Sequence, residues 1–338
     1  MLIILDISTQ AVVNRGVIYM KKLCSFVLVL VLVASVFAMG GKDAVPASSG
    51  KTVTVTGLDG NLAATQVEVP FNPQRIAILD MAALDILDAL NLGDRVIGMA
   101  GTTLPYLSDY SSNKNLANLG TIKEANLEAV MASEPDVIFI GSRLSASYDV
   151  LSQIAPVVQL AVDRKLGVVE SVRQNATTIA SIFGKEAEIE SLMADFDQRI
   201  TALADFAQDK NGVIGLCTSG GFNVLGNDGR CSIIGTEIGF TNIGASAVTS
   251  THGNESSFEL LVKLNPQYLF VLDRDAAIQA QGAKLAQEII ENQLVMKTDA
   301  YKNGNIVYLD NPAVWYTAEG GITALDIMLQ DLEGALLK

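Results

Sequence analysis

The sequence predicts an α/β protein of two Rossmann-like lobes, each with a mostly parallel sheet, joined by a single long helix. Three observations support this prediction. Short apolar strands alternate with helical stretches in both halves of the chain, a long helical stretch without proline separates the halves, and one helix–strand unit occurs twice. The 338 residues, 49% of them hydrophobic and 18% charged, suffice for two globular lobes with a core each.

The N-terminus has the features of a secretory signal peptide. Met20-Lys21-Lys22 precedes an apolar run over residues 23–37, and Val36-Phe37-Ala38 offers a small-residue cleavage site. We therefore predict a signal peptide over residues 1–38 with its true start at Met20, and a flexible leader over residues 39–51. A retained membrane anchor is the open alternative, although the run is short for a span of about 20 residues.

The cysteines bear on the compartment. No Cys directly follows the apolar run, so we expect no lipid anchor, and an exported protein without one is expected in a periplasm. Cys217 and Cys231 remain after cleavage, and the sequence leaves open whether they form a disulfide.

The N-terminal lobe is predicted over residues 52–166. Alternating residues at 52–56 and 66–69 around Asp59-Gly60 predict a β-hairpin. Beyond Arg75, predicted strands and helices alternate, which indicates βα units and a parallel sheet. The predicted strands are Ile76–Leu79, Val96–Met99, Val137–Ile140 and Val157–Leu160.

The connecting helix is predicted over residues 167–190 and the C-terminal lobe over residues 191–338. Between Val168 and Asp209 the chain has no proline and a single glycine, Gly184, and its apolar residues recur at helical spacing. Strands and helices then alternate again to the C-terminus. We expect a single stiff connection to allow only small motion between the lobes.

An internal repeat relates the two lobes. Residues 126–140 match residues 257–271 at an offset of 131, and each copy reads as a short helix, a proline, a buried strand and then an arginine. The arginines are Arg143 and Arg274. Ligands bind outside the carboxyl ends of strands in open α/β sheets, so the repeat predicts that both lobes present an arginine to a shared cleft.

Three further residues are candidates for that cleft. His252, the sole histidine, lies in a polar run before the second repeat helix; a loop histidine is often merely solvated. Tyr316 lies between a predicted strand and the last helix, in a segment that Pro312, Gly320 and Gly321 predict to be an irregular loop; core packing is the alternative. Arg230 follows a predicted Gly226–Gly229 turn; simple exposure to solvent is the alternative.

Charge excludes some classes of function. A net charge of −14 argues against general nucleic-acid binding, which needs a basic face. The chain lacks a Ser-His-Asp order, a phosphate-binding Gly-rich loop followed by Lys, and paired-histidine zinc spacing, so an enzyme is not expected. Arg143, Arg230 and Arg274 gathered in an acidic protein would favour a compact anion as ligand.

Three segments together resemble the class III, iron-siderophore (FecB/FhuD-like) periplasmic binding proteins, especially the catecholate receptors. They are THGNESSFELLVKLNPQYLFVLDRD, PAVWYTAEGG and NLEAVMASEPDVIFI, and the likeness covers about residues 52–338. The resemblance implies a periplasmic, monomeric solute-binding protein of an ABC importer, without an intrinsic cofactor. Its ligand would be a ferric siderophore, which it delivers to a permease and its ATPase.

The resemblance also implies residue roles. Arg143, Arg230 and Arg274 would bind the anionic siderophore, while His252 and Tyr316 would complete the Fe(III) shell of a tetradentate catecholate. Fe(III) is a hard cation that favours oxygen donors such as a phenolate. Glu128 and Glu259 would dock on the permease, and the repeat pairs these two residues as well. Haem, cobalamin or a hydroxamate siderophore is the alternative ligand. In residues 104–111 no ligand residue can be assigned.

Overall fold

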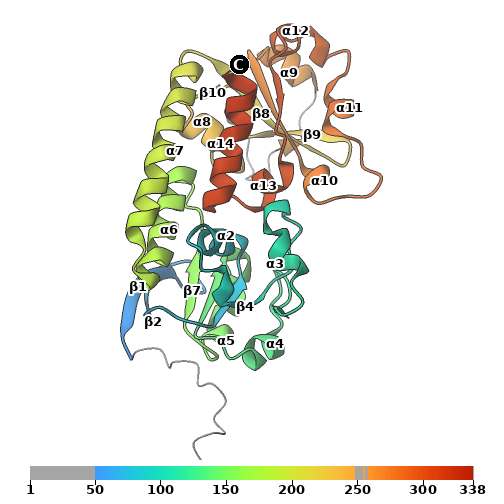
Figure 1. Cartoon of the computed structure of the whole chain (residues 1–338). Coiled ribbons are helices and arrows are strands. Elements are labelled where there is room, and N and C mark those ends of the chain that lie inside the picture. The colour runs from blue at the N-terminus through green and yellow to red at the C-terminus, as the bar shows by residue number, and fades with distance from the viewer. Residues whose placement is uncertain (1–49, 248–253, 256–257, 338) are drawn as a thin grey trace, which may run out of the picture. The chain divides into compact units, whose positions relative to one another are not determined.

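A computed structural model describes residues 50–247, 254–255 and 258–337 (Figure 1). The predicted signal peptide, nearly all of the predicted leader, and His252 lie outside these residues. Within the described ranges, no helix is both long and apolar enough to cross a membrane.

The described chain begins with the predicted hairpin. β1 (Thr52–Leu58) and β2 (Ala64–Pro70) pair antiparallel. Between the strands, the Asp59 carboxylate accepts hydrogen bonds from the backbone N–H groups of Asn61 and Ala63, at 2.8 and 2.9 Å. This is an Asx-type turn, which a short acidic side chain stabilises.

The first sheet is parallel and has the order β5-β4-β3-β6-β7. Its strands are β3 (Ile76–Leu79), β4 (Val96–Met99), β5 (Ala117–Asn118), β6 (Val137–Gly141) and β7 (Val157–Leu160). The connections contain α2 (Met81–Ala89), η1 (Gly93–Arg95), η2 (Pro105–Leu107), α3 (Ser108–Ser112), α4 (Leu127–Ala132), η3 (Ser142–Ser147) and α5 (Tyr148–Leu151). All of β3 is buried, as expected for a parallel strand covered on both faces.

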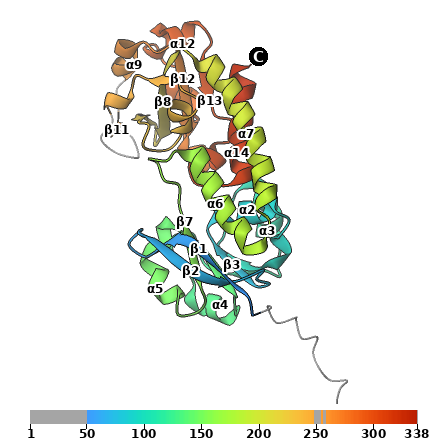
Figure 2. The same cartoon turned by 90° about the vertical axis from the view of Figure 1, so that its left-hand side faces the viewer.

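The connection between the lobes is a helix pair, which corrects the predicted single helix over residues 167–190. α6 (Val168–Phe183) ends at Gly184, whose φ of 68° is left-handed, and α7 (Glu186–Ala207) begins directly afterwards. Glycine adopts this conformation without a Cβ penalty, so it ends α6 and lets the chain reverse. Arg173 of α6 donates to Asp197 of α7 at 2.7 Å, and the helices run side by side (Figures 1 and 2). The long element that leads into the second sheet is α7.

The second sheet is mostly parallel. Its described strands are β8 (Asn211–Thr218), β9 (Gly221–Leu225), β10 (Thr241–Asn242), β11 (Asn254–Glu255), β12 (Tyr268–Asp273) and β13 (Ile306–Tyr308). β10, β12 and β13 run parallel to β8, whereas β9 and β11 form an antiparallel edge. The other elements are α8 (Ile233–Thr236), η4 (Ala245–Ala247), α9 (Phe258–Leu264), α10 (Arg274–Ala277), α11 (Ala286–Ile290), η5 (Val295–Lys297), α12 (Asp299–Lys302), α13 (Pro312–Thr317) and α14 (Ile322–Leu336). The predicted α/β fold with mostly parallel sheets is confirmed.

The internal repeat has a structural counterpart. α4–β6 and α9–β12 are equivalent units, and each ends with an arginine just past its strand. Glu134 and Asn265, which precede the two matching prolines, have left-handed φ values of 46° and 47°. The match therefore extends to an unusual backbone conformation that the side chains alone do not reveal.

One hydrophobic cluster is shared by the two lobes, and it runs from the first sheet through α6, α7 and α14 to one face of the second sheet. A second, smaller cluster covers the other face of the second sheet. Residues 50–338 form one compact unit. The lobe boundaries at 52–166 and 191–338 accordingly stay predictions, and below "N-terminal lobe" means β1–β7 with their helices and "C-terminal lobe" means β8–α14.

Candidate ligand-binding site

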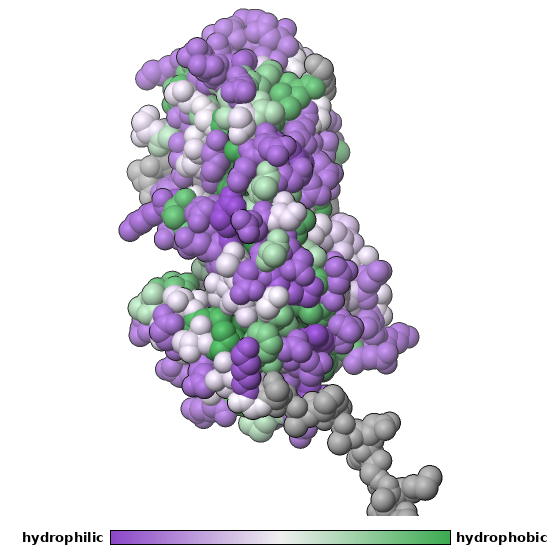
Figure 3. Space-filling model, turned by 60° about the vertical axis from the view of Figure 1, so that its left-hand side comes forward, coloured by the Kyte–Doolittle hydropathy of each residue, from purple (hydrophilic) through white to green (hydrophobic). Residues whose placement is uncertain are grey.

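A cavity of about 330 Å³ lies between the lobes. It is lined by residues that follow β3, β6 and β7 in the N-terminal lobe, and by residues 228–230 and 316–320 in the C-terminal lobe. The position agrees with the expectation that ligands bind outside the carboxyl ends of parallel strands. In the space-filling view the surface is hollowed between the two lobes (Figure 3).

The N-terminal wall contains Arg143 and Asp80. Arg143 follows β6 in η3 and is exposed to the cavity. Asp80 caps α2, where its carboxylate accepts from Ala83 N–H at 3.0 Å. Burial raises the pKa of the Asp80 carboxyl, while Ala83 N–H and the charge of Arg143 act in the opposite direction. Gly141 allows this arrangement, since a Cβ there would lie 3.2 Å from the Asp80 carboxyl carbon.

On the C-terminal wall, two arginines surround Tyr316. The Arg230 guanidinium lies over the phenol ring at 4.1 Å from its centroid, and its Nε–H donates to the Tyr316 carbonyl at 3.0 Å. The Arg274 Nε–H donates to the Tyr316 hydroxyl at 3.0 Å, and this bond is the main cause that raises the pKa of Arg274. Arg230 and Tyr316 line the cavity itself, whereas Arg274, which the repeat predicts to face the cleft, is not among the lining residues and reaches it only through the phenol hydroxyl.

Asp275 holds Arg274 in this position. The Asp275 carboxylate is buried and accepts from Arg274 Nη1 at 3.2 Å, from Thr218 Oγ1 at 3.2 Å and from Ser219 N–H at 2.6 Å. A buried carboxylate with three donors is well satisfied, so it anchors the guanidinium on the tyrosine.

The segment predicted as an irregular loop contains a short helix, so that prediction is wrong. Pro312 is the first residue of α13, where a missing N–H costs nothing, and the helix divides the Trp-Tyr pair between two environments. Trp315 is fully buried and donates from Nε1 to Asp331 at 2.8 Å, whereas Tyr316 lines the cavity. The alternative that this Trp-Tyr pair packs in the core therefore applies to Trp315.

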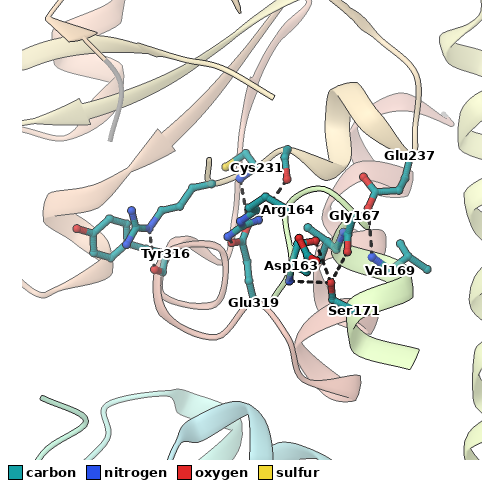
Figure 4. Close-up of polar contacts among 12 residues, drawn as sticks. Asp163, Arg164, Gly167, Val169, Ser171, Cys231, Glu237, Tyr316 and Glu319 are labelled. Carbon is teal, nitrogen blue, oxygen red and sulfur yellow. Dashed lines mark hydrogen bonds and ion pairs between the residues drawn. The ribbon is translucent and has the colours of Figure 1, made fainter. Parts of the chain in front are cut away.

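Sequence reasoning missed several charged residues of the cavity. Arg164 and the carboxylates Asp80, Asp228 and Glu319 line it together with Arg143 and Arg230. Arg164 and Glu319 form an ion pair across the lobes (Figure 4). The cavity is therefore not an uncompensated cluster of arginines, because carboxylates are interspersed among them. Asp80 could have been found from the sequence, because it lies between a predicted strand and a predicted helix. Asp228 and Glu319 had no such signal.

His252 lies outside the described residues, so the structure assigns it no position. Within the described part of the chain, no group of three or more His, Cys, Asp or Glu side chains is placed to bind a metal ion. Cys217 and Cys231 are both buried and free; burial raises the pKa of the Cys217 thiol to about 12 and raises that of Cys231 as well.

Glu128 and Glu259 occupy equivalent places. Each is exposed in the first turn of its helix, Glu128 in α4 and Glu259 in α9. Neither lines the cavity.

Comparison with known proteins connects this geometry with a family. A family model described as "periplasmic binding protein" matches residues 76–313. The chain belongs to this family. The predicted resemblance is thereby confirmed, and the family is one of binding proteins.

Relatives within the periplasmic binding proteins are named for siderophores. The petrobactin-binding protein YclQ of Bacillus subtilis is 33% identical over 322 residues, which are 94% of this chain and 100% of that protein. The ferric-anguibactin-binding protein FatB of Vibrio anguillarum is 26% identical, with 83% of this chain and 93% of that protein covered.

Solved structures agree with the fold. The crystal structure of YclQ superimposes with a TM-score of 0.78 at 32% identity, covering 85% of this chain and 99% of that one. The periplasmic catecholate-siderophore binding protein VctP of Vibrio cholerae gives a TM-score of 0.76 at 30% identity, covering 84% of this chain and all of that one.

Proposed function

We propose that this protein binds a ferric catecholate siderophore in the cavity between its lobes and delivers it to an ABC importer in the inner membrane. The main support is that side chains from both lobes line one cavity. Arg143 comes from the N-terminal lobe, and Arg230 and the phenol of Tyr316 come from the C-terminal lobe. The names of YclQ and VctP, which refer to petrobactin and to catecholate siderophores, point to the same ligand class.

The chemistry of the ligand matches these groups. Catecholate oxygens leave a ferric complex strongly anionic, and guanidinium groups offset such charge with charge-assisted hydrogen bonds. A volume of about 330 Å³ lies at the small end of the range for small-molecule sites, so it suits the iron chelate core, with the siderophore backbone outside.

Iron coordination is part of the proposal. Tyr316 would supply a phenolate to Fe(III) when a tetradentate siderophore leaves coordination positions open, and His252 would supply an imidazole. Fe(III) removes the phenolic proton on coordination, and Arg274, already bonded to the hydroxyl, would then face an oxyanion. The iron is cargo of the transport cycle, and no resident cofactor is proposed.

Glu128 and Glu259 are proposed to dock on the permease, one on each lobe. Their exposure at equivalent first turns supports this role. We further propose that the mature protein begins after residue 38, works in the periplasm as a monomer, and partners with the permease and its ATPase.

The test is a titration of the purified mature protein with a panel of ferric siderophores. Trp315, the chain's only tryptophan, directly precedes Tyr316, which lines the cavity, so we expect a bound ferric siderophore to quench its fluorescence. We expect ferric catecholates to quench with the highest affinity. Preference for a ferric hydroxamate or cobalamin, or a Soret band with haem, would overturn the ligand class.

Docking is tested separately. Glu128→Arg and Glu259→Arg should leave the dissociation constant of the ferric siderophore unchanged while abolishing uptake by cells that depend on this protein. Loss of siderophore binding in either variant would refute the docking role.

A further inference from the structure

Arg164 connects the two lobes at the cavity. It follows β7, in the segment that leads to α6, and its side chain is 28% exposed. Its Nη1 donates to Ser232 Oγ at 3.2 Å, and its Nη2 forms an ion pair with Glu319; both acceptors belong to the C-terminal lobe. Figure 4 shows Arg164 between Cys231 and Glu319.

Glu319 has a second acceptor role. Its side chain is 7% exposed, and its other carboxylate oxygen accepts from Cys231 N–H at 3.0 Å. Cys231 has a left-handed φ of 60° and directly follows Arg230. Glu319 therefore fixes the turn that projects Arg230 onto Tyr316, and it does so through one oxygen while the other holds Arg164.

The guanidinium of Arg164 has donor capacity beyond these contacts. A guanidinium carries five N–H donors in a fixed fork. Among the described residues, the hydrogen bonds of Arg164 go from Nη1 to Ser232 and from Nη2 to Glu319, one from each nitrogen. Because the residue also lines the cavity, its remaining donors are available to a ligand while the ion pair stays intact.

The segment around Arg164 is held firmly. Glu237, from the C-terminal lobe, accepts from the N–H groups of Val168 and Val169 and so caps α6. Ser171 Oγ donates to the Gly167 carbonyl and accepts from Asp163 N–H (Figure 4). With its backbone fixed on both sides, Arg164 is pre-organised to meet a ligand at low entropic cost.

We propose that Arg164 is a further ligand-binding residue, whose guanidinium binds the anionic chelate while it stays paired with Glu319. This inference rests on the proposed function. Glu319 would set specificity, because its negative charge opposes any anion that approaches Arg164. A chelate must then carry enough negative charge to interact favourably with the guanidinium despite the carboxylate beside it.

Two variants with opposite expected signs test the proposal. Arg164→Gln should weaken binding of a ferric tris-catecholate about tenfold or more, the scale of one charge-assisted hydrogen bond. Glu319→Gln keeps an acceptor for Cys231 N–H but removes the negative charge, so it should tighten binding of the same chelate. Dissociation constants come from Trp315 fluorescence, and a neutral ferric hydroxamate chelate serves as the control whose affinity should change little.

A purely structural role predicts a different result. If the ion pair only joins the lobes, Arg164→Gln and Glu319→Gln should weaken binding of every chelate in parallel and lower the unfolding midpoint together. If Arg164 binds the ligand, by contrast, Arg164→Lys, which restores the charge without the planar fork, should regain part of the tris-catecholate affinity.

The outcomes separate the two claims. If Arg164→Gln binds the ferric tris-catecholate as tightly as the wild type, the role of Arg164 is refuted. It is refuted as well if both glutamine variants lose affinity for every chelate in parallel. Either result leaves the proposed function standing. Failure of the wild-type protein to bind any ferric catecholate would overturn the proposed function and the role of Arg164 with it.

Discussion

Two of the places where the lobes meet differ in how their polar groups are satisfied. At the junction of α2 with α14, Asp85 is fully buried and accepts from Thr323 N–H at 2.7 Å, Ala324 N–H at 2.9 Å and Tyr106 Oη at 2.9 Å. At the cavity, by contrast, Arg143 and Arg164 keep part of their surface exposed.

The difference separates two tasks. At the α2–α14 junction a carboxylate at a helix N-terminus is enclosed by protein donors, so this contact contributes to stability and fixes the lobes. At the cavity the charged groups keep donors for an external anion. Changes at the junction should therefore alter stability, and changes at the cavity should alter binding.

The largest effect is expected from Gly321→Ala at the junction. A Cβ at Gly321 would lie 2.8 Å from the Asp85 Cβ and closer still to its carboxylate, so we expect a loss of about 3 kcal/mol in unfolding free energy. Gly334→Ala inside α14, the helix that Gly321 precedes as N-cap, is the control, because a Cβ there would be exposed with nothing within 4 Å. It should stabilise the protein by about 0.5–1 kcal/mol. Urea denaturation of both variants measures the difference; a similar stability for the two would contradict the junction's role.

The next effect concerns the cavity. Tyr316→Phe should weaken a tetradentate ferric catecholate about tenfold while affecting a hexadentate one less, because only the former leaves iron positions for the phenolate. Fluorescence titration with both ligands measures this, and equal losses would argue against coordination. Tyr308→Phe is the control: among the described residues its hydroxyl is buried without a hydrogen-bond partner, so its removal should leave binding unchanged.

The smallest effect is the pH dependence of the junction. Burial raises the pKa of the Asp85 carboxyl above its usual range, against the hydrogen bonds from Thr323, Ala324 and Tyr106. A raised pKa means that the folded state binds the proton more tightly. The corresponding stability is present below the unfolded pKa of about 4 and is lost as pH rises through the folded value.

Asp85→Asn removes this titration. The unfolding free energy of the wild type relative to Asp85→Asn should fall as pH rises above about 4, because the Asp85 carboxyl then loses its proton in the folded state. Denaturation at a series of pH values measures the trend. A difference that grows with pH would show that the donors around Asp85 outweigh its burial.

Much of the fold followed from local pattern. The hairpin, the alternation of strands and helices and the repeat all rest on neighbours close in sequence, where periodicity and turn residues act directly. The repeat also placed Arg143 and Arg274 at strand ends. The helix break at Gly184 was missed although its signal was present, since glycine after an amphipathic run commonly ends a helix.

The sequence by itself determined the fold class, the family and the positions of Arg143 and Arg274 just past β6 and β12, because the carboxyl ends of parallel strands lie at one edge of a sheet whatever the rest of the chain does. Only the tertiary structure decided the partners of Arg164 and Asp85. Arg164 pairs with Glu319, 155 residues away, and Asp85 accepts from Thr323, 238 residues away. Such pairs depend on how the two lobes pack against each other, and no spacing along the chain encodes that distance.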